Sequence, residues 1–169
     1  MGKNYFYNGS LAVSSPNLVH TRMPSHAKKN VSMGALDGLI GFHLRIAQIR
    51  VFKDFEDGVG ELGLTPAGFS VMEVLRQNPG LTQSKLAAAI MLDRSSVVPL
   101  LDKLEKKGLL SRQSSTTDRR NNHLFLSEEG IKVLEASKAL VKKHESRIAK
   151  ALSKEESQQL IGLLSRLAV

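Results

Sequence analysis

Two short helices separated by a tight turn are the feature that most constrains the fold of this chain. Thr82 is a typical N-cap for the run QSKLAAAIM, and Asp93 is a typical N-cap for RSSVVPLLDKLEKK, which Gly108 ends. The oxygen of such a side chain accepts a hydrogen bond from an amide that has no partner within the helix. The pattern predicts a helix-turn-helix whose second helix is longer and more basic. An ordinary helical hairpin fits these residues about equally well.

The residues that follow favour the first alternative. LLSRQ and HLFLS are short runs with β propensity, and the loop SSTTDRRNN between them consists of turn-forming residues with two adjacent arginines. A hairpin directly after a helix-turn-helix is the wing of a winged helix. Arginines at its tip suit the negative potential of a DNA minor groove. We therefore expect a winged helix-turn-helix domain over residues 63–126.

Apolar residues in helical patterns flank this domain on both sides. Residues 33–62 predict a helix with more apolar residues than one stripe needs, broken by DGVGELG, and residues 127–169 predict two further helices. The last helix begins with a capping box, S-K-E-E, at Ser153. Helices that are apolar on several sides need a partner, so we expect these segments to form the dimerisation region of a homodimer. The predicted fold class is mainly α with a small β-hairpin wing.

The charge of the chain indicates a polyanionic partner. The formal net charge is +8, and residues 94–120 contain seven basic and three acidic side chains. Residues 1–30 contain four basic side chains and no acid. Because this first segment is rich in Ser and Asn, we expect residues 1–32 to be a disordered tail.

Several classes of protein are excluded by what the sequence lacks. The absence of cysteine removes disulfides, thiolate metal sites and cysteine nucleophiles, and the five histidines show no metal-ligand spacing. There is no nucleophile elbow, P-loop or dinucleotide fingerprint, so we expect neither an enzyme nor a cofactor. No apolar run approaches the roughly 18 residues of a membrane span, and the first residues do not form a signal peptide. The expected location is the cytoplasm.

The order of the motifs resembles that of the MarR family of bacterial transcription regulators. The pieces that carry the resemblance are LTPAGFSVMEVL, LTQSKLAAAIMLDRSSV, LDKLEKKGLL and TTDRRNNHLFLSEEG, and it covers about residues 36–169. The resemblance implies a dimer, commonly a repressor, with one winged helix-turn-helix per subunit reading a pseudo-palindromic site on double-stranded DNA. The two recognition helices would lie about 34 Å apart. The alternative is an architectural DNA-binding protein of low sequence specificity that has no effector.

The periodicity of the recognition helix separates a buried stripe from an outward face. Val97, Leu101 and Leu104 are expected to face the core, and Pro99 to lie near the centre of the outward face of one continuous helix. The resemblance places the family's D-x-R pattern of the wing at Asp118 and Arg120. The residues expected to contact DNA are Thr82, Gln83, Ser84, Arg94, Ser95, Ser96, Val98, Pro99, Lys103, Lys106, Arg112, Asp118, Arg119 and Arg120. Family members often carry a polar or basic residue at position 99, so Val98 and Pro99 would instead offer apolar contacts to thymine methyl groups or sugars.

The resemblance also implies an effector between the dimerisation helices and the winged domain. In relatives it is a small aromatic acid, a phenolic compound or a similar anion, and the coenzyme A thioester of such an acid is a further candidate. The residues expected to wall the site are Phe42, His43, Arg45, Ile46, Arg50, Phe69 and Met72. Apart from the two arginines, only His43 offers a charge or a hydrogen bond to a carboxylate or phenol. The sequence nevertheless favours a purely structural role for this histidine, in the core or at the interface.

Overall fold

The computed structural model describes residues 31–114 and 122–167 of the chain. The chain divides into two compact units, Met1–Gly38 and Leu39–Val169. The described part of the first unit contains one short 3-10 helix, η1 (Gly34–Gly38). All other helices and strands of the described residues belong to the second unit.

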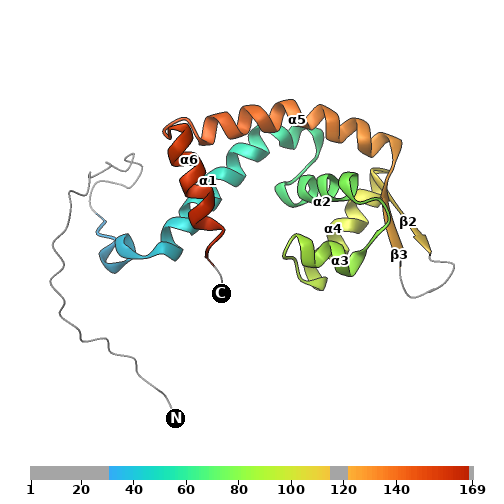
Figure 1. The fold of residues 1–169 in the computed structure, drawn as a ribbon, viewed down its shortest axis with the longest axis horizontal. Coiled ribbons are helices and arrows are strands. Elements are labelled where there is room, and N and C mark those ends of the chain that lie inside the picture. Colours follow the sequence, from blue (N-terminus) through green and yellow to red (C-terminus); the bar gives the residue numbers. More distant parts are fainter. Residues whose placement is uncertain (1–30, 115–121, 168–169) are drawn as a thin grey trace, which may run out of the picture. The chain divides into compact units, whose positions relative to one another are not determined.

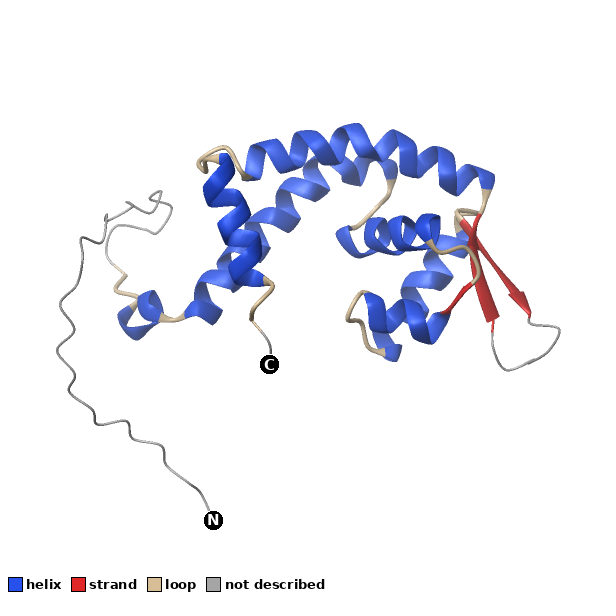
Figure 2. Ribbon diagram, viewed as in Figure 1, coloured by secondary structure: helices blue, strands red, loops and turns tan. Residues whose placement is uncertain are grey.

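The second unit is mainly helical with a small antiparallel sheet, which confirms the predicted fold class (Figures 1 and 2). Its long helix α5 packs against α1 at one end and against the winged domain at the other. The elements are α1 (Ile40–Gly58), the 3-10 helix η2 (Val59–Leu62), α2 (Pro66–Gln77), β1 (Leu81–Thr82), α3 (Gln83–Ala89), α4 (Arg94–Lys106), β2 (Leu110–Ser114), β3 (Asn122–Leu126), α5 (Glu128–Ile148) and α6 (Lys154–Leu164).

The N-terminal helix differs from the prediction at both ends. The segment expected to be one helix over 33–62 consists of η1, α1 and η2, and α1 continues through the first of the glycines that were expected to break it. Gly58 lies against α5, where an added Cβ would be 3.1 Å from a guanidinium nitrogen of Arg147. Val59 is fully buried. This packing holds the segment helical, and the turn comes only at Gly63, which has a φ of +70°.

Side chains cap the helix starts, as predicted at Thr82, Asp93 and Ser153. The side chains of Thr65, Thr82, Asp93 and Ser127 each accept a hydrogen bond from the backbone amide three positions later. Ser153 forms the complete capping box with Glu156. Each cap uses only neighbours in sequence, and each was therefore predictable.

The sheet contains one strand more than the predicted hairpin. Its order is β1-β3-β2, and β1 pairs with β3 through Leu81 and Leu124. The connection is strengthened at Gly80, whose amide donates to the Leu124 carbonyl at 2.9 Å and whose carbonyl accepts from Nδ1 of His123 at 2.7 Å. A strand of two residues carries no alternating pattern, so β1 could not be predicted from the sequence.

One hydrophobic core joins the winged domain to α5. Fully buried residues come from α2 (Met72), α3 (Leu86), α4 (Leu101), β3 (Leu124) and α5 (Leu134). The recognition helix is thus held on its inner face by the same core that anchors the long C-terminal helix. In contrast, α6 buries none of its described residues.

Candidate nucleic-acid interface

The burial of α4 fixes which of its faces is available to a ligand. Val97, Leu101 and Leu104 are at most 3% exposed, which confirms the predicted buried stripe. The helix is continuous through Pro99, as predicted, and this proline is exposed. The other exposed side chains that were predicted to contact DNA from this helix are Arg94, Ser95, Ser96, Lys103 and Lys106, whereas Val98 is half-buried.

The start of α4 is ordered by its own cap. Asp93 accepts from the hydroxyl of Ser95 at 2.6 Å and from the amide of Ser96 at 2.8 Å. These hydrogen bonds, that from the Ser95 hydroxyl first, lower the pKa of the Asp93 carboxyl. Asp93 therefore holds both serines in place, and the hydroxyl oxygens of the serines keep lone pairs for a donor on DNA.

An open groove brings together residues from the two helices of the helix-turn-helix. Its volume is about 600 Å³, and its polar lining consists of Gln83, Ser84, Arg94 and Asn122. The first three were predicted to contact DNA. Asn122, the first residue of β3, was missed because its placement depends on how the sheet packs beside α3. Thr82, another predicted contact, caps α3, and its hydroxyl lies 3.4 Å from that of Ser84.

Arg112, a predicted DNA contact, is paired within the chain. From β2 its guanidinium pairs with Asp102 at 2.6 Å and with Glu105, both on α4. Its backbone amide also donates to the Glu105 carboxylate at 3.2 Å. The side chain is only 19% exposed, and its charge is already neutralised by two carboxylates. Arg112 is therefore a brace between the stem of the wing and the recognition helix, with little surface left for a phosphate.

The wing tip lies outside the described residues, and with it the predicted contacts Asp118, Arg119 and Arg120. The structure does describe the stem. Ser114 at the end of β2 pairs with Asn122 at the start of β3. The predicted hairpin is thus formed up to the residues that flank the tip.

The predicted effector residues on α1 and α2 differ in exposure. On α1, Phe42 and Ile46 are half-buried, and the ring of Phe42 packs edge-on against His43 with centroids 5.7 Å apart. His43, Arg45 and Arg50 are exposed, and Phe69 of α2 is half-buried. Met72 is 0% exposed within the core. The prediction that Met72 lines an effector site is wrong for this structure, because its side chain has no surface to offer.

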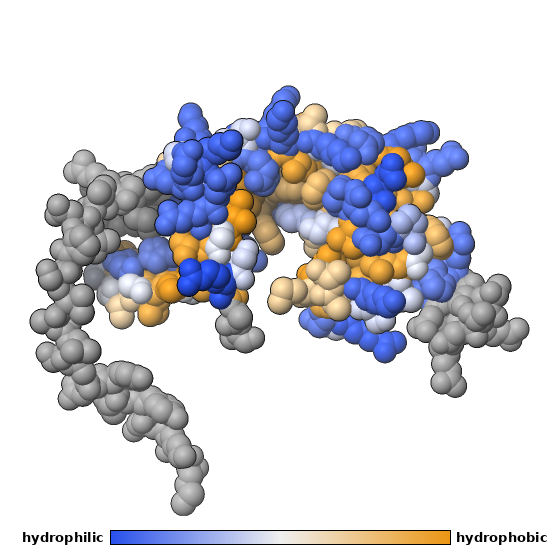
Figure 3. Space-filling view, in the orientation of Figure 1, coloured by the Kyte–Doolittle hydropathy of each residue, from blue (hydrophilic) through white to orange (hydrophobic). Residues whose placement is uncertain are grey.

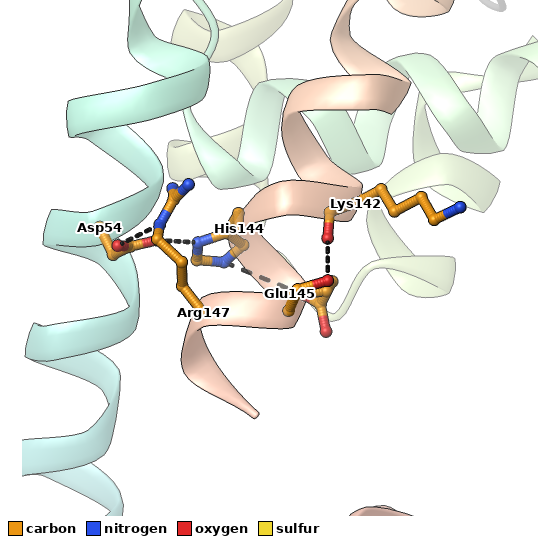
Figure 4. Close-up of polar contacts among 6 residues, drawn as sticks. Asp54, Lys142, His144, Glu145 and Arg147 are labelled. Atoms are coloured by element: carbon orange, nitrogen blue, oxygen red, sulfur yellow. Dashed lines mark hydrogen bonds and ion pairs between the residues drawn. The ribbon is translucent and has the colours of Figure 1, made fainter. Parts of the chain in front are cut away.

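An ion-pair cluster that the sequence did not indicate joins α1 to α5 (Figure 4). Asp54 of α1 accepts from Nε of Arg147 at 2.8 Å and contacts Nδ1 of His144 at 2.6 Å. The bonds from Arg147 and then from His144 lower the pKa of Asp54 to about 2. His144 is buried, with its ring edge-on to Phe55 at a centroid distance of 5.3 Å. These residues are some ninety positions apart, so no local pattern links them.

Large apolar side chains remain exposed on α1 and α6. Figure 3 shows apolar surface over α6 on the visible face. Ile40 and Ile161 are each 65% exposed. The others in these helices are Leu44, Ile49, Phe52, Leu160, Leu163 and Leu164. So many exposed apolar side chains on two helices mark an interaction surface.

Within the residues that the structure describes, other kinds of site are not apparent. No described helix has the length and apolar character that a membrane span requires. No group of three or more His, Asp or Glu side chains in the same residues is placed to hold a metal ion.

Comparisons with known proteins identify the family and several relatives of this chain. The model of the MarR family matches residues 64–121. A Thauera aromatica protein described as a transcriptional regulatory protein for the hcr operon is 40% identical over 135 residues, which are 79% of this chain and 81% of that protein.

Two solved structures of the transcriptional repressor CouR are similar to the chain. CouR bound to a 23-mer DNA duplex is 38% identical, with a TM-score of 0.78 over 83% of this chain and 99% of that one. CouR bound to p-coumaroyl-CoA is 37% identical, with a TM-score of 0.74 over 80% of this chain and 96% of that one.

Proposed function

This chain belongs to the MarR family of transcription regulators, and on that premise we propose that it is a repressor that binds a pseudo-palindromic operator as a homodimer. We further propose that a small aromatic or phenolic acid, or its coenzyme A thioester, releases it from DNA. Members of the family regulate transcription and are not enzymes.

The observation that carries the DNA-binding proposal is the outward face of α4. Its inner face is buried in the core, so Arg94, Ser95 and Lys103 project from a rigid helix. The same fold is found on a DNA duplex in a repressor 38% identical to this chain. A helix presented in this way fits the major groove, where its first turn reads base edges and its lysines contact phosphates.

The proposed contacts fall into three groups. The start of α4, with Val98 and Pro99, faces bases; the groove residues Gln83 and Ser84 bind the backbone beside it. Arg120 at the wing tip enters the minor groove, Asp118 braces the loop or a neighbouring arginine, and Arg119 contacts a phosphate. The remaining proposed phosphate contacts are Thr82, Lys103 and Lys106.

The exposed apolar surface of α1 and α6 supports the homodimer. A monomer would leave Ile40, Phe52 and Ile161 in water together with the other apolar residues of these helices. A second copy covers them with an identical surface through a two-fold axis, and the same axis matches the symmetry of a pseudo-palindromic operator.

The effector proposal rests on α1 and on the relatives. Phe42, Ile46 and Phe69 offer partly buried apolar surface, and the exposed cations Arg45 and Arg50 lie on the same helix as His43. Apolar walls with a few polar groups suit an aromatic acid. A repressor 37% identical to this chain is known with p-coumaroyl-CoA bound, which makes an acyl thioester the first ligand to test.

The test begins with an operator selected from random duplexes. Binding to this operator and to a scrambled duplex is compared at one physiological salt concentration. A specific regulator prefers its operator by roughly 10³-fold or more. A ratio near one would instead support the architectural alternative.

The effector is tested by thermal shift and by release of DNA. Aromatic acids, phenolics and their coenzyme A thioesters are added to the free protein and to its operator complex, with free coenzyme A as the control. A ligand that raises the melting temperature of the free protein and lowers its affinity for the operator supports the proposal. If no ligand raises the melting temperature or lowers the affinity for the operator, the effector proposal is contradicted for these chemical classes.

A further inference from the structure

The recognition helix α4 is attached to the dimerisation helices at its C-terminal end. Lys107, the C-cap residue, donates from Nζ to the carbonyl oxygen of Gly63 at 2.7 Å. The two residues are 44 positions apart. By contrast, the N-cap Asp93 uses its carboxylate within the helix start itself. The end of the helix that lies away from the proposed base contacts therefore carries the long-range bond.

The carbonyl that Lys107 binds is held in a fixed direction. Gly63 ends η2 with a φ of +70°, and its amide donates to the carbonyl of Gly60 at 2.7 Å. The helix η2 follows α1 without a break and packs against α5. An added Cβ at Gly63 would lie 2.5 Å from Nζ of Lys107, so glycine permits this approach. The Gly63 carbonyl thus marks the point where the first dimerisation helix meets the winged domain.

A second set of contacts ties the same helix end to α5. Ser127, the N-cap of α5, donates from its hydroxyl to the Gly108 carbonyl at 2.5 Å and from its amide to the Leu109 carbonyl at 3.1 Å. An added Cβ at Gly130 would overlap the Leu109 carbonyl. This contact is close and rigid, and it forms a fixed pivot for α4. The bond from Lys107 to Gly63 lies beside this contact and connects the same helix end to η2.

We propose that Lys107 is the positioning residue that sets the angle of the recognition helix relative to α1 and α5. This inference rests on the proposed function, since the angle matters for a helix that reads DNA. An effector bound between η2 and α5 would shift the end of η2 relative to the start of α5. Because Lys107 is bonded to Gly63, this shift would move α4 and so displace the end of the helix that reads DNA. The proposed role of Lys107 does not require contact with DNA.

Because α4 is long, a small rotation about its C-terminal end displaces the start of the helix. Its 13 residues span about 20 Å at 1.5 Å per residue. A rotation of about 10° about the pivot moves the start of the helix by about 3.4 Å, which is the spacing of one base pair. Loss of the bond should therefore relax the preferred separation of the two operator half-sites.

The first arm of the test measures the position of α4 without DNA. Because the chain has no cysteine, spin labels at Met91→Cys and Ala139→Cys report one distance within the chain, between the helix-turn-helix and α5. Both sites are exposed, Met91 by 92%. Excess unlabelled protein keeps one labelled chain in each assembly. The distance distribution is compared among the parent chain, Lys107→Met, Lys107→Arg and the control Lys132→Met, which removes the same charge from α5.

We expect Lys107→Met to shift or broaden the distribution, and Lys107→Arg, which keeps a donor, to restore it. Lys107 is exposed, so removing it should leave the fold intact. Lys107→Ala, which also removes the donor, serves as a second variant if the methionine aggregates. The proposal would be overturned if the distance distributions of the two variants that remove the donor were both identical to that of Lys132→Met.

The second arm uses the selected operator and two versions with the half-site separation changed by one base pair. The preference of Lys107→Met for the original separation should fall by roughly fivefold to tenfold, the size expected for one solvent-exposed hydrogen bond. An unchanged preference contradicts the proposal. If the parent chain does not distinguish its operator from a scrambled duplex, the proposed function fails, and the distance arm still decides the role of Lys107.

Discussion

The imidazole of His144 on α5 contacts the carboxylate of Asp54 on α1, with 2.6 Å between Nδ1 and Oδ2. Arg147, one helical turn further along α5, binds the same carboxylate through Nε at 2.8 Å. Asp54 therefore forms a polar link between α1 and α5. The same two helices are also in contact through the ring of Phe55 against His144.

Replacement of this carboxylate should lower stability in a pH-dependent way. Its pKa is lowered from 3.8 to about 2, so the ionised group stabilises the fold fully above pH 4, and this contribution is lost as the pH falls through about 2. Asp54 is 31% exposed, and solvent screening limits the loss in Asp54→Asn at pH 7 to on the order of 1 kcal/mol. Urea unfolding at pH 7, 4 and 2.5 measures the difference in free energy of unfolding between Asp54→Asn and the parent chain. Glu56→Gln, at an exposed position on the same helix, is the control. A difference that does not shrink below pH 4 would point to altered packing instead.

Removal of the brace at Arg112 should weaken DNA binding without changing its salt dependence. Arg112→Met leaves Asp102 and Glu105 without their partner and loosens the stem of the wing from α4. We expect a loss of about 1 kcal/mol in stability and a lower affinity for the operator. The slope of log affinity against log salt should stay constant, whereas loss of a phosphate contact in Lys106→Met reduces it by about 1. A reduced slope in Arg112→Met would show that this arginine binds phosphate after all.

The wing tip is tested at Arg120. If this side chain enters the minor groove, Arg120→Ala weakens binding to the operator by on the order of 1–3 kcal/mol. Arg119→Ala, its neighbour and proposed phosphate contact, provides the comparison and should lower binding to operator and scrambled duplexes alike. If Arg120→Ala and the parent chain bind the operator with equal affinity, the side chain of Arg120 does not contact DNA.

A substitution at Pro99 tests the stability of α4 and its recognition of DNA separately. An interior proline costs a helix roughly 3 kcal/mol, and Pro99 is exposed, so Pro99→Ala should raise the free energy of unfolding by an amount up to that value. The same variant should lose preference for its operator if the ring contacts thymine methyl groups or sugars. Thermal unfolding and binding to operator and scrambled duplexes measure the two effects. A variant that is more stable and binds identically reduces Pro99 to a tolerated defect.

The proposed dimer should depend on the last helix. A chain ending at Ala151 lacks α6, none of whose described residues is buried within its own chain. We expect this truncation to abolish the dimer while the helix-turn-helix keeps its core, as measured by sedimentation together with circular dichroism. A folded dimer without α6 would contradict the assigned interface and move it to α1 and α5.

The helical part of the fold and the outer face of α4 were predictable for one reason. Caps such as Thr65 and Asp93 act on amides three positions away, and the buried stripe of Val97, Leu101 and Leu104 repeats every three or four residues. These interactions form within one helix and leave a local pattern in the sequence. The wing was predictable in the same way, from two β-prone runs on either side of a turn.

The tertiary structure alone decided the contacts between elements. Arg112 looked like a phosphate ligand until the packing of β2 placed it beside Glu105, and Met72 looked like a pocket residue until the core enclosed it. The bond from Lys107 to Gly63 and the contact of Asp54 with His144 span 44 and 90 positions. Polar side chains at such separations meet only after the hydrophobic core has fixed the orientation of the helices that carry them. Periodicity shows that a helix has a buried face, and the packed core determines which residues of distant helices lie against it.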